Sequence, residues 1–347
     1  MKSCVIYGPR NLRVEEGPTP DPGPGMVRLR TGAVGVCGSD IHYYHLGRVG
    51  DAVLREPMVP GHEIAGVVDA VGPDVSGLRV GDRVIVNPSD ECGVCAWCRE
   101  GRQNLCPDLK YYGSAARMPH VQGVMREFPL VQARQCIPID AAVPMAQAAC
   151  VEPLAIALHA VRRAGDMLGR RVFVCGAGPV GCLIAAVARL NGAGEVIISD
   201  LEGFPLERAR ELGADVTINA RDEAALERLN GSCDVCFEAS GSAPGLASCL
   251  MAARRGGDVV HVGFQHANDV PYPVNAAVIR KELSVHGSLR AYQEFPLAAR
   301  LVGNGRIRLE PLITAVMPLE DAAAAIDLAA DKTCSLKVVL AGPAIGD

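Results

Sequence analysis

The stretch from Arg171 to Asp200 constrains the fold of this chain more than any other. A short apolar run, Arg171–Cys175, leads into G-A-G-P-V-G at residues 176–181 and then into a helix-like stretch. A second apolar run, Glu195–Ser199, follows and is closed by Asp200. Strand, glycine turn, helix and strand make a βαβ unit, which needs a parallel sheet covered by helices. An ordinary glycine-rich turn, the alternative, does not need the flanking strands or the acidic residue.

The glycine turn has the spacing of a dinucleotide-binding loop. Its first glycine permits the tight turn, its second lets the backbone approach a pyrophosphate, and its third lets the helix pack closely on the strand. Pyrophosphate is favoured at the helix N-terminus, where unpaired N–H groups point outward. Asp200 can accept hydrogen bonds from a ribose diol and would repel a 2′-phosphate, so we expect NAD rather than NADP. The expected cofactor contacts in this loop are Gly176, Gly178, Pro179, Val180 and Gly181.

The same alternation continues towards the C-terminus and predicts a doubly wound parallel sheet of six strands. The further strands are expected at Val216–Ile218, Asp234–Glu238, Asp258–Val262 and Leu283–Gly287. The helices are expected at Val180–Asn191, Pro205–Leu212, Asp222–Leu229 and Ala243–Ala253. The carboxyl ends of parallel strands face the ligand, so the turns after the last two strands supply further candidate cofactor contacts. These are Val262, Gly263, Phe264, Ser288, Leu289 and Arg290.

Residues 1–90 have a different sequence pattern, in which short apolar runs are separated by glycine and proline. Such runs predict a compact, mostly antiparallel β domain with the candidate metal ligands on its loops. A helix at Leu319–Ala330 and a strand at Ser335–Leu340 are expected to return and complete this domain. The expected strands of the N-terminal part are Ser3–Tyr7, Met26–Val36, Glu63–Ala70 and Asp82–Val86.

Four cysteines carry the clearest metal-binding signal in the sequence. Cys92, Cys95, Cys98 and Cys106 follow a C-x2-C-x2-C-x7-C spacing on a glycine-containing loop. Thiolates spaced in this way can converge on one Zn²⁺, and the fourth completes a tetrahedron with no open position. Such a site is structural, because no position remains for a substrate. A zinc-ribbon recognition module, the alternative, needs paired knuckles on a basic surface, which the net charge of −5 disfavours.

A second donor set lies in two short motifs nearer the N-terminus. Cys37 in V-C-G-S-D-I-H and His62 and Glu63 in P-G-H-E offer a thiolate, an imidazole and a carboxylate. Three protein ligands suffice for a catalytic Zn²⁺, because the fourth position then stays open for water or substrate. The same first motif contains two groups suited to proton transfer, Ser39 and His42. The alternative is a buried core thiol and an unrelated surface loop.

Two later features extend this candidate site. Glu152 heads an apolar helix-like stretch at Ala155–Ala164. Its carboxylate either provides only a favourable charge at a helix N-terminus or reaches the metal or its water. Residues 111–113 and 117–120 form a polar and aromatic loop typical of substrate clefts, and a plain solvated loop is the alternative.

Length and composition frame these expectations. A chain of 347 residues is expected to form two domains. The net charge of −5 argues against a nucleic-acid partner. No apolar run approaches the roughly 18 residues of a membrane span, and no cleavable leader is evident, so we expect a cytoplasmic protein with no membrane partner. Fourteen cysteines, four clustered and the rest scattered, fit metal binding plus buried thiols in a reducing compartment.

The chain resembles the zinc-dependent medium-chain dehydrogenases of the alcohol and polyol dehydrogenase family from end to end. The resemblance rests on V-C-G-S-D-I-H, P-G-H-E, the four-cysteine lobe, Glu152-Pro153 and G-A-G-P-V-G. Within this family it is most similar to the L-idonate 5-dehydrogenases and next to the sorbitol dehydrogenases. The segments that carry the closer similarity are N-P-S at 87–89, Y-G-S-A at 112–115, M-P-H-V at 118–121 and G-S-L-R at 287–290.

The resemblance implies an architecture and a metal site. A GroES-like catalytic domain would comprise residues 1–149 and 287–347 with a structural zinc lobe at 88–108, and a Rossmann NAD-binding domain would comprise 150–286. Cys37, His62 and Glu63 would hold the catalytic zinc. Glu152 would bind that ion directly or through water, or exchange with Glu63. Two zinc ions per chain are therefore expected.

The resemblance also implies how protons and substrate are handled. Ser39 would take the substrate hydroxyl proton and pass it through the nicotinamide ribose to His42 and solvent. Tyr43 and Arg290 resemble substrate contacts, and Arg290 is the natural partner of a substrate carboxylate because a guanidinium binds one bidentately. Competing candidates for the carboxylate are Arg117 and His120.

The implied reaction is NAD-dependent oxidation of a secondary alcohol of a sugar acid to a ketone, most similar to L-idonate to 5-keto-D-gluconate. Sorbitol or xylitol oxidation is the alternative within the family, and relatives suggest a homodimer or homotetramer. Remoter alternatives are a zinc-free quinone reductase and a non-catalytic zinc- and nucleotide-binding protein. Polyol dehydrogenases usually carry an arginine near the adenine where this chain has Pro205. Adenine stacking is then expected to come from elsewhere.

Overall fold

The computed structural model describes residues 1–264 and 270–347, which divide into two compact units. The first unit contains Met1–Ala155, Tyr292–Asp331 and Lys337–Asp347, and the second contains Ile156–Ala291 and Lys332–Leu336. Helix α4 (Val151–Ala164) begins in the first unit and ends in the second. Within the described residues, no helix has the length and apolarity needed to cross a membrane.

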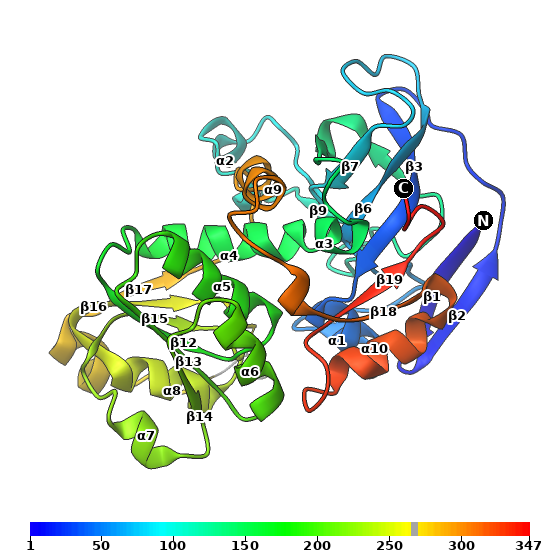
Figure 1. Ribbon diagram of the computed structural model, residues 1–347. Helices are drawn as coiled ribbons and strands as arrows, with labels where there is room; N and C mark the ends of the chain where they lie inside the picture. The colour runs from blue at the N-terminus through cyan, green and yellow to red at the C-terminus, as the bar shows by residue number, and fades with distance from the viewer. Residues whose placement is uncertain (265–269) are drawn as a thin grey trace. The chain divides into compact units, whose positions relative to one another are not determined.

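The first unit is built on a seven-stranded sheet in the order β11-β7-β6-β3-β19-β18, with β10 paired to β3. Every neighbouring pair is antiparallel except β18 and β19, which confirms the mostly antiparallel prediction. The C-terminal strand β19, red in Figure 1, lies beside the N-terminal β3, so the end of the chain returns as predicted. The strands are β3 (Met26–Gly35), β6 (Glu63–Val71), β7 (Arg83–Val86), β10 (Leu130–Gln132), β11 (Cys136–Pro138), β18 (Ile313–Pro318) and β19 (Lys337–Ala341).

Smaller elements complete the first unit. The short strand pairs are β1 (Lys2–Gly8) with β2 (Asn11–Glu16), β4 (Arg48–Val49) with β5 (Ala52–Val53), and β8 (Ser89–Asp90) with β9 (Lys110–Tyr111). The helices are α1 (Gly38–Leu46), α2 (Ala96–Arg99), α3 (Met145–Ala149), α9 (Phe295–Gly303) and α10 (Ala322–Ala330).

Alternation along β3 explains how the sheet forms one side of a core. Val27 and Leu29 are fully buried and join the core cluster that α10 covers. Arg28, between them in sequence, points to the other face and pairs with Asp69 at 2.6 Å. Successive side chains of a strand face opposite ways, so apolar residues at every second position bury one face of the sheet.

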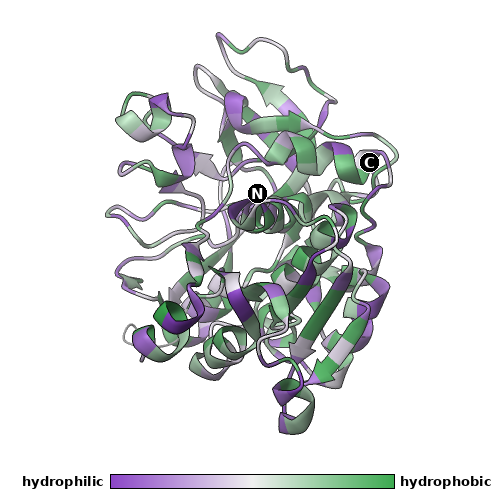
Figure 2. Cartoon of the chain, turned by 90° about the vertical axis from the view of Figure 1, so that its left-hand side faces the viewer, coloured by the Kyte–Doolittle hydropathy of each residue, from purple (hydrophilic) through white to green (hydrophobic). Residues whose placement is uncertain are grey.

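The second unit is a six-stranded parallel sheet in the order β14-β13-β12-β15-β16-β17, which confirms the doubly wound prediction. Helices flank the sheet, and its central strands are largely hydrophobic (Figures 1 and 2). The strands are β12 (Arg171–Cys175), β13 (Glu195–Asp200), β14 (Val216–Asn219), β15 (Cys233–Glu238), β16 (Ala253–His261) and β17 (Ser284–Gly287). The helices are α5 (Pro179–Leu190), α6 (Gly203–Glu211), α7 (Glu223–Glu227) and α8 (Ala243–Ala252).

One local prediction needs correction. The sequence placed the metal ligands on loops, and Cys37 and His62 do lie outside helices and strands, but α1 follows Cys37 directly and Glu63 is the first residue of β6. Cys37 is the N-cap of α1, and the helix ends at Gly47, whose φ of 67° suits glycine. The helix was missed because two adjacent tyrosines and a leading glycine hide its apolar periodicity.

Candidate metal and nucleotide sites

A buried carboxylate joins the two loops that carry the first donor set. Asp40 accepts hydrogen bonds from the backbone N–H of Cys37 through Oδ2 and from that of Gly61 through Oδ1, each at 2.9 Å. Its side chain is fully buried, so each oxygen needs such a partner. Asp40 therefore aligns the start of α1 with the loop that precedes His62. The role of Asp40 was not predicted, although its place three residues after an N-cap is a capping signal.

Cys37, His62 and Glu63 offer ligand atoms that all lie within 4.8 Å of one another. His62 and Glu63 are buried, with 6% and 1% of their surface exposed. Burial disfavours a charged imidazole, but Cys37, followed by Asp40 and Glu152, outweighs it and raises the pKa of His62 to about 10. This anionic surrounding favours a cation at the position where the three side chains meet. The donor set therefore fits a divalent zinc ion with an open fourth position.

Lys337, the first residue of β19, forms a buried ion pair with Glu63. Its Nζ lies 2.8 Å from each carboxylate oxygen of Glu63 and donates to the carbonyl of Val36 at 2.9 Å. Lysine and glutamate side chains are 2% and 1% exposed, so the pair is dry. Lys337 was not predicted, because its one signal in the sequence is a lysine at the start of the apolar run K-V-V-L.

Gly35 makes the room for that carboxylate. It pairs with Glu63 across β3 and β6, and a Cβ atom at Gly35 would lie 1.9 Å from Oε2 of Glu63. No side chain can be accommodated at that distance. The glycine thus serves a close approach rather than an unusual backbone angle.

Glu152 lies in the first turn of α4 and is held by a tyrosine. Tyr111 donates its hydroxyl to Oε1 of Glu152 at 2.6 Å, and its ring centroid lies 5.4 Å from that of His62. Glu152 is 4% exposed, and burial raises its pKa to about 7 against the lowering influence of His62. Glu152 therefore lies near the Cys37–His62–Glu63 group but is not among the three residues whose ligand atoms converge.

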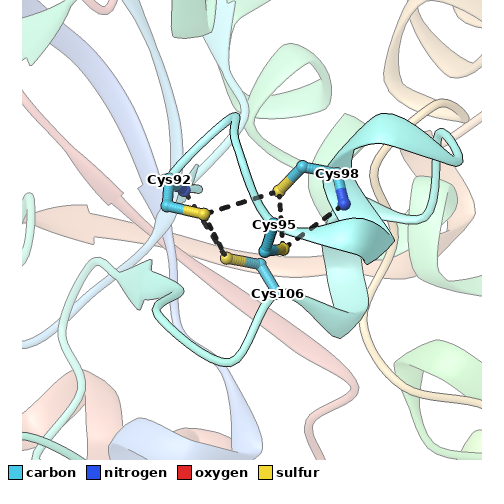
Figure 3. Close-up of side chains that lie close together, drawn as sticks. All are labelled: Cys92, Cys95, Cys98 and Cys106. Atoms are coloured by element: carbon cyan, nitrogen blue, oxygen red, sulfur yellow. Dashed lines mark hydrogen bonds between the residues drawn. The ribbon is translucent and has the colours of Figure 1, made fainter.

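The four predicted lobe cysteines converge on one point (Figure 3). Sulfur to sulfur distances are 3.4 Å for Cys95–Cys98, 3.5 Å for Cys92–Cys106 and 4.0 Å for Cys92–Cys98. Four thiolates about 2.3 Å from one zinc ion would be roughly 3.8 Å apart, whereas a disulfide needs about 2.05 Å. Backbone N–H groups of Val94 and Cys95 lower the pKa of Cys92 to about 7. This geometry fits a closed Zn²⁺ site.

The predicted cofactor residues gather at the carboxyl edge of the parallel sheet. Gly176 follows β12 with φ of 102°, and a Cβ there would lie 2.7 Å from the backbone nitrogen of Ser240. Helix α5 starts at Pro179 after Gly178, and a Cβ on Gly181 would meet the carbonyl oxygen of Gly176 at 1.8 Å. The first and third glycines of the motif are thus used as predicted, for the turn and for close packing of the helix start, and the role of Gly178 beside a pyrophosphate stays a prediction. The residues that follow β16 and β17 at this edge are Val262, Gly263, Phe264, Ser288, Leu289 and Arg290.

Asp200 ends β13 beside the glycine loop. Its Oδ2 accepts from the N–H of Ala177 at 2.7 Å and its Oδ1 from the N–H of Glu202 at 3.1 Å. A guanidinium that sequence analysis missed lies close by, since Arg221 contacts the carbonyl of Leu201 and pairs with Glu202 at 2.8 Å. Arg221 follows the neighbouring strand β14, so only the sheet order brings it here.

The predicted substrate contacts of the first unit form hydrogen bonds within the chain. Tyr43 is buried and accepts from the N–H of Ala115 at 3.0 Å. Arg117 donates to Asp108 and to the carbonyls of Pro107 and Leu109.

His120 is 5% exposed, and both of its ring nitrogens have backbone partners, the N–H of Arg55 at 2.9 Å and the carbonyl of Arg117 at 2.8 Å. A cleft of about 260 Å³ lies beside this loop and is lined by residues 51–53, Arg55 and residues 115–118. In the second unit, Arg290 has a φ of 57°.

Comparison with known proteins identifies relatives along the whole chain. The alcohol dehydrogenase GroES-like domain matches residues 23–141, and the zinc-binding dehydrogenase domain matches residues 179–304. The chain is 38% identical over 342 residues to the L-idonate 5-dehydrogenase (NAD(P)(+)) of Escherichia coli K12, covering 98% of each protein. It is 35% identical to the sorbitol dehydrogenase of Bacillus subtilis, covering 98% of this chain and 97% of that enzyme.

Solved structures give the same picture. The crystal structure of L-idonate 5-dehydrogenase from Escherichia coli superposes with a TM-score of 0.92 at 37% identity, over 98% of this chain and 97% of the other. An alcohol dehydrogenase from Escherichia coli CFT073, solved with NADH, superposes with a TM-score of 0.88 at 32% identity, over 98% and 99% of the two chains.

Proposed function

The chain belongs to the zinc-binding alcohol dehydrogenase family, and on that premise we propose that it oxidises a secondary alcohol of a sugar acid to a ketone with NAD⁺. The reaction that similarity to the relatives favours is L-idonate to 5-keto-D-gluconate. The observation that carries the proposal is the convergence of half-buried Cys37 with buried His62 and Glu63. We assign residues 1–149 and 287–347 to the catalytic domain and 150–286 to the NAD-binding domain.

The chain's own residues supply the metal ligands and the proton path. Cys37, His62 and Glu63 would hold a zinc ion, which would act as a Lewis acid and lower the pKa of a substrate hydroxyl. Ser39 and His42 are three residues apart on α1 and thus share a helix face, as a proton path from substrate to solvent needs. NAD⁺, when bound, would accept a hydride from the carbon that carries this hydroxyl, so that one alcohol and one NAD⁺ would give one ketone, one NADH and one proton.

The sugar-acid preference needs a cation for the substrate carboxylate. We assign this role to Arg290, because a guanidinium matches a carboxylate in a bidentate geometry. Arg117 and His120 make the local hydrogen bonds described above, so we assign them to holding their loop. Arg55 is exposed beside the cleft and is a second basic candidate.

Initial rates with NAD⁺ test the proposal, with L-idonate and D-sorbitol compared at matched concentrations before and after metal chelation. We expect a chelator-sensitive rate on L-idonate well above that on D-sorbitol. A preference for sorbitol would make the protein a polyol dehydrogenase, the second candidate that the 35% identical relative supports. A rate insensitive to full metal removal would contradict the zinc assignment.

We also propose that the chain forms a homo-oligomer, a dimer or tetramer, in the cytoplasm. Sedimentation velocity of the purified protein tests the assembly. A single species with the mass of one chain would contradict it.

A further inference from the structure

Two carboxylates beside His62 are held by different kinds of donor. Both oxygens of Glu63 accept from Lys337, whereas the donor to Glu152 among the residues that the structure describes is the Tyr111 hydroxyl, on Oε1 at 2.6 Å. Both glutamates are buried, at 1% and 4% exposure. A buried carboxylate without a partner is costly, so each donor determines where its carboxylate rests.

Tyr111 is itself fixed in place from two sides. It ends β9, and its backbone pairs with Ser89 of β8. Its ring lies against the imidazole of His62 at 5.4 Å between centroids. The phenol therefore reaches Glu152 from a rigid position, and a short charge-assisted hydrogen bond of this kind is a strong one.

Resting on the proposed function, we infer that Tyr111 is a positioning residue that keeps Glu152 beside the metal but outside its coordination shell. Glu63 is the carboxylate whose ligand atom converges with those of Cys37 and His62, and Glu152 is not part of that group. Oε1 of Glu152 accepts from the phenol, which leaves Oε2 to accept a hydrogen bond from a second substrate hydroxyl, next to the one whose proton Ser39 would take. The fourth metal position then stays open.

Removal of the Tyr111 hydroxyl would change where the Glu152 carboxylate lies. In Tyr111→Phe the ring can still pack on His62, but Oε1 of Glu152 loses its donor inside a dry site. The strongest remaining attraction for that carboxylate is the metal cation, so Glu152 would turn into the open position and compete with substrate.

Tyr112→Phe is the matched control. The neighbouring tyrosine also donates its hydroxyl to a buried side chain, Oε1 of Gln135, at 2.7 Å. The acceptor of that hydrogen bond is a side-chain amide, whereas the acceptor of the Tyr111 bond is a carboxylate near the metal ligands. A general cost of losing a tyrosine hydroxyl would therefore appear in both variants.

The experiment compares Co²⁺-loaded and Zn²⁺-loaded wild type with both variants, and uses Cys37→Ser to assign the cobalt bands of the catalytic position. In Tyr111→Phe we expect the visible bands of the catalytic cobalt to shift, because a carboxylate oxygen of Glu152 would then occupy the fourth position that water or substrate takes in wild type. We also expect the KM for substrate to rise on the order of tenfold, the effect of one charge-assisted hydrogen bond. Tyr112→Phe should change neither the spectrum nor the KM by more than about twofold.

Two other results are decisive. Identical cobalt spectra and KM values in Tyr111→Phe and wild type would overturn the role of Tyr111 and leave the proposed function intact. If the cobalt spectra of wild type and Cys37→Ser were the same, no cobalt would be bound at Cys37. The catalytic metal site would then be wrong, and both proposals would be contradicted.

Discussion

At the residue scale, the candidate catalytic site depends on buried charged side chains that are paired with opposite charges. Lys337 and Glu63 form a pair with almost no solvent exposure. Burying two charges is expensive, and removal of one partner from such a pair typically costs about 3–5 kcal/mol. A zinc ion on Glu63 would offset part of that loss, because it supplies another positive charge.

We therefore expect Lys337→Met to destabilise the zinc-free protein by about 3 kcal/mol and the zinc-loaded protein by less. Urea denaturation with and without a chelator measures both values. Lys281→Met is the control, since Lys281 donates to three backbone carbonyls and faces no carboxylate among its described contacts. An equal loss with and without zinc would contradict the proximity of Glu63 to the metal.

Asp200 should set the preference for NAD over NADP. Replacement by alanine removes the repulsion of a 2′-phosphate, and Arg221 nearby can then attract it, so Asp200→Ala should narrow the NAD to NADP ratio of kcat/KM by at least about tenfold. The double variant Asp200→Ala/Arg221→Ala should regain part of the preference. An unchanged ratio in the single variant would show that Asp200 does not face the ribose.

At the element scale, predictions succeeded where the signal was local. The glycine motif, the strands around it and the cysteine spacing each lie within a short stretch, and the structure confirms the sheet and the convergence of the four sulfurs. Contacts between distant residues could not be predicted. Lys337 and Glu63 are 274 positions apart and Tyr111 and Glu152 are 41 apart, so only the folded sheet order brings them together.

The cysteine lobe depends on its metal because it has little core of its own. Its buried cluster contains only Cys98, Cys106 and Leu109. We expect Cys106→Ser to lose the structural zinc and about 3 kcal/mol of stability. Cys334→Ser, at an exposed position, is the control. An unchanged melting temperature with full zinc content would contradict a structural site.

A hydrogen bond joins the lobe to the segment before α9. Tyr292 donates to Oε1 of Glu91 at 2.7 Å, and Arg134 reaches the same oxygen at 2.8 Å. Burial acts to raise the pKa of Glu91, but the bonds from Tyr292 and Arg134 outweigh it, so the pKa is lowered in the folded protein.

A lowered pKa in the folded state contributes stability above the unfolded value of 4.5, and this contribution is lost as the pH falls through the folded value. Tyr292→Phe should therefore cost about 1 kcal/mol near pH 7, less in high salt, and the difference from wild type should shrink below pH 4.5. Denaturation at a series of pH values measures it. A difference that grows on acidification would have the wrong sign.

At the scale of the whole molecule, two donor sets predict two zinc ions with separate tasks. One set is closed by four thiolates, and the other offers three ligands and an open position. The family assignment agrees with zinc binding at both donor sets, and the sequence motifs predicted the ligands of both. The donors that hold the carboxylates, Lys337 and Tyr111, emerge only from the fold.

Zinc content per chain, measured together with the NAD⁺-linked rate in wild type and in Cys37→Ser, tests this account most directly. We expect two zinc ions and activity in wild type, and one zinc ion, a retained fold and no measurable turnover in Cys37→Ser. Two zinc ions with a wild-type rate in the Cys37→Ser protein would contradict the catalytic metal centre at Cys37, His62 and Glu63.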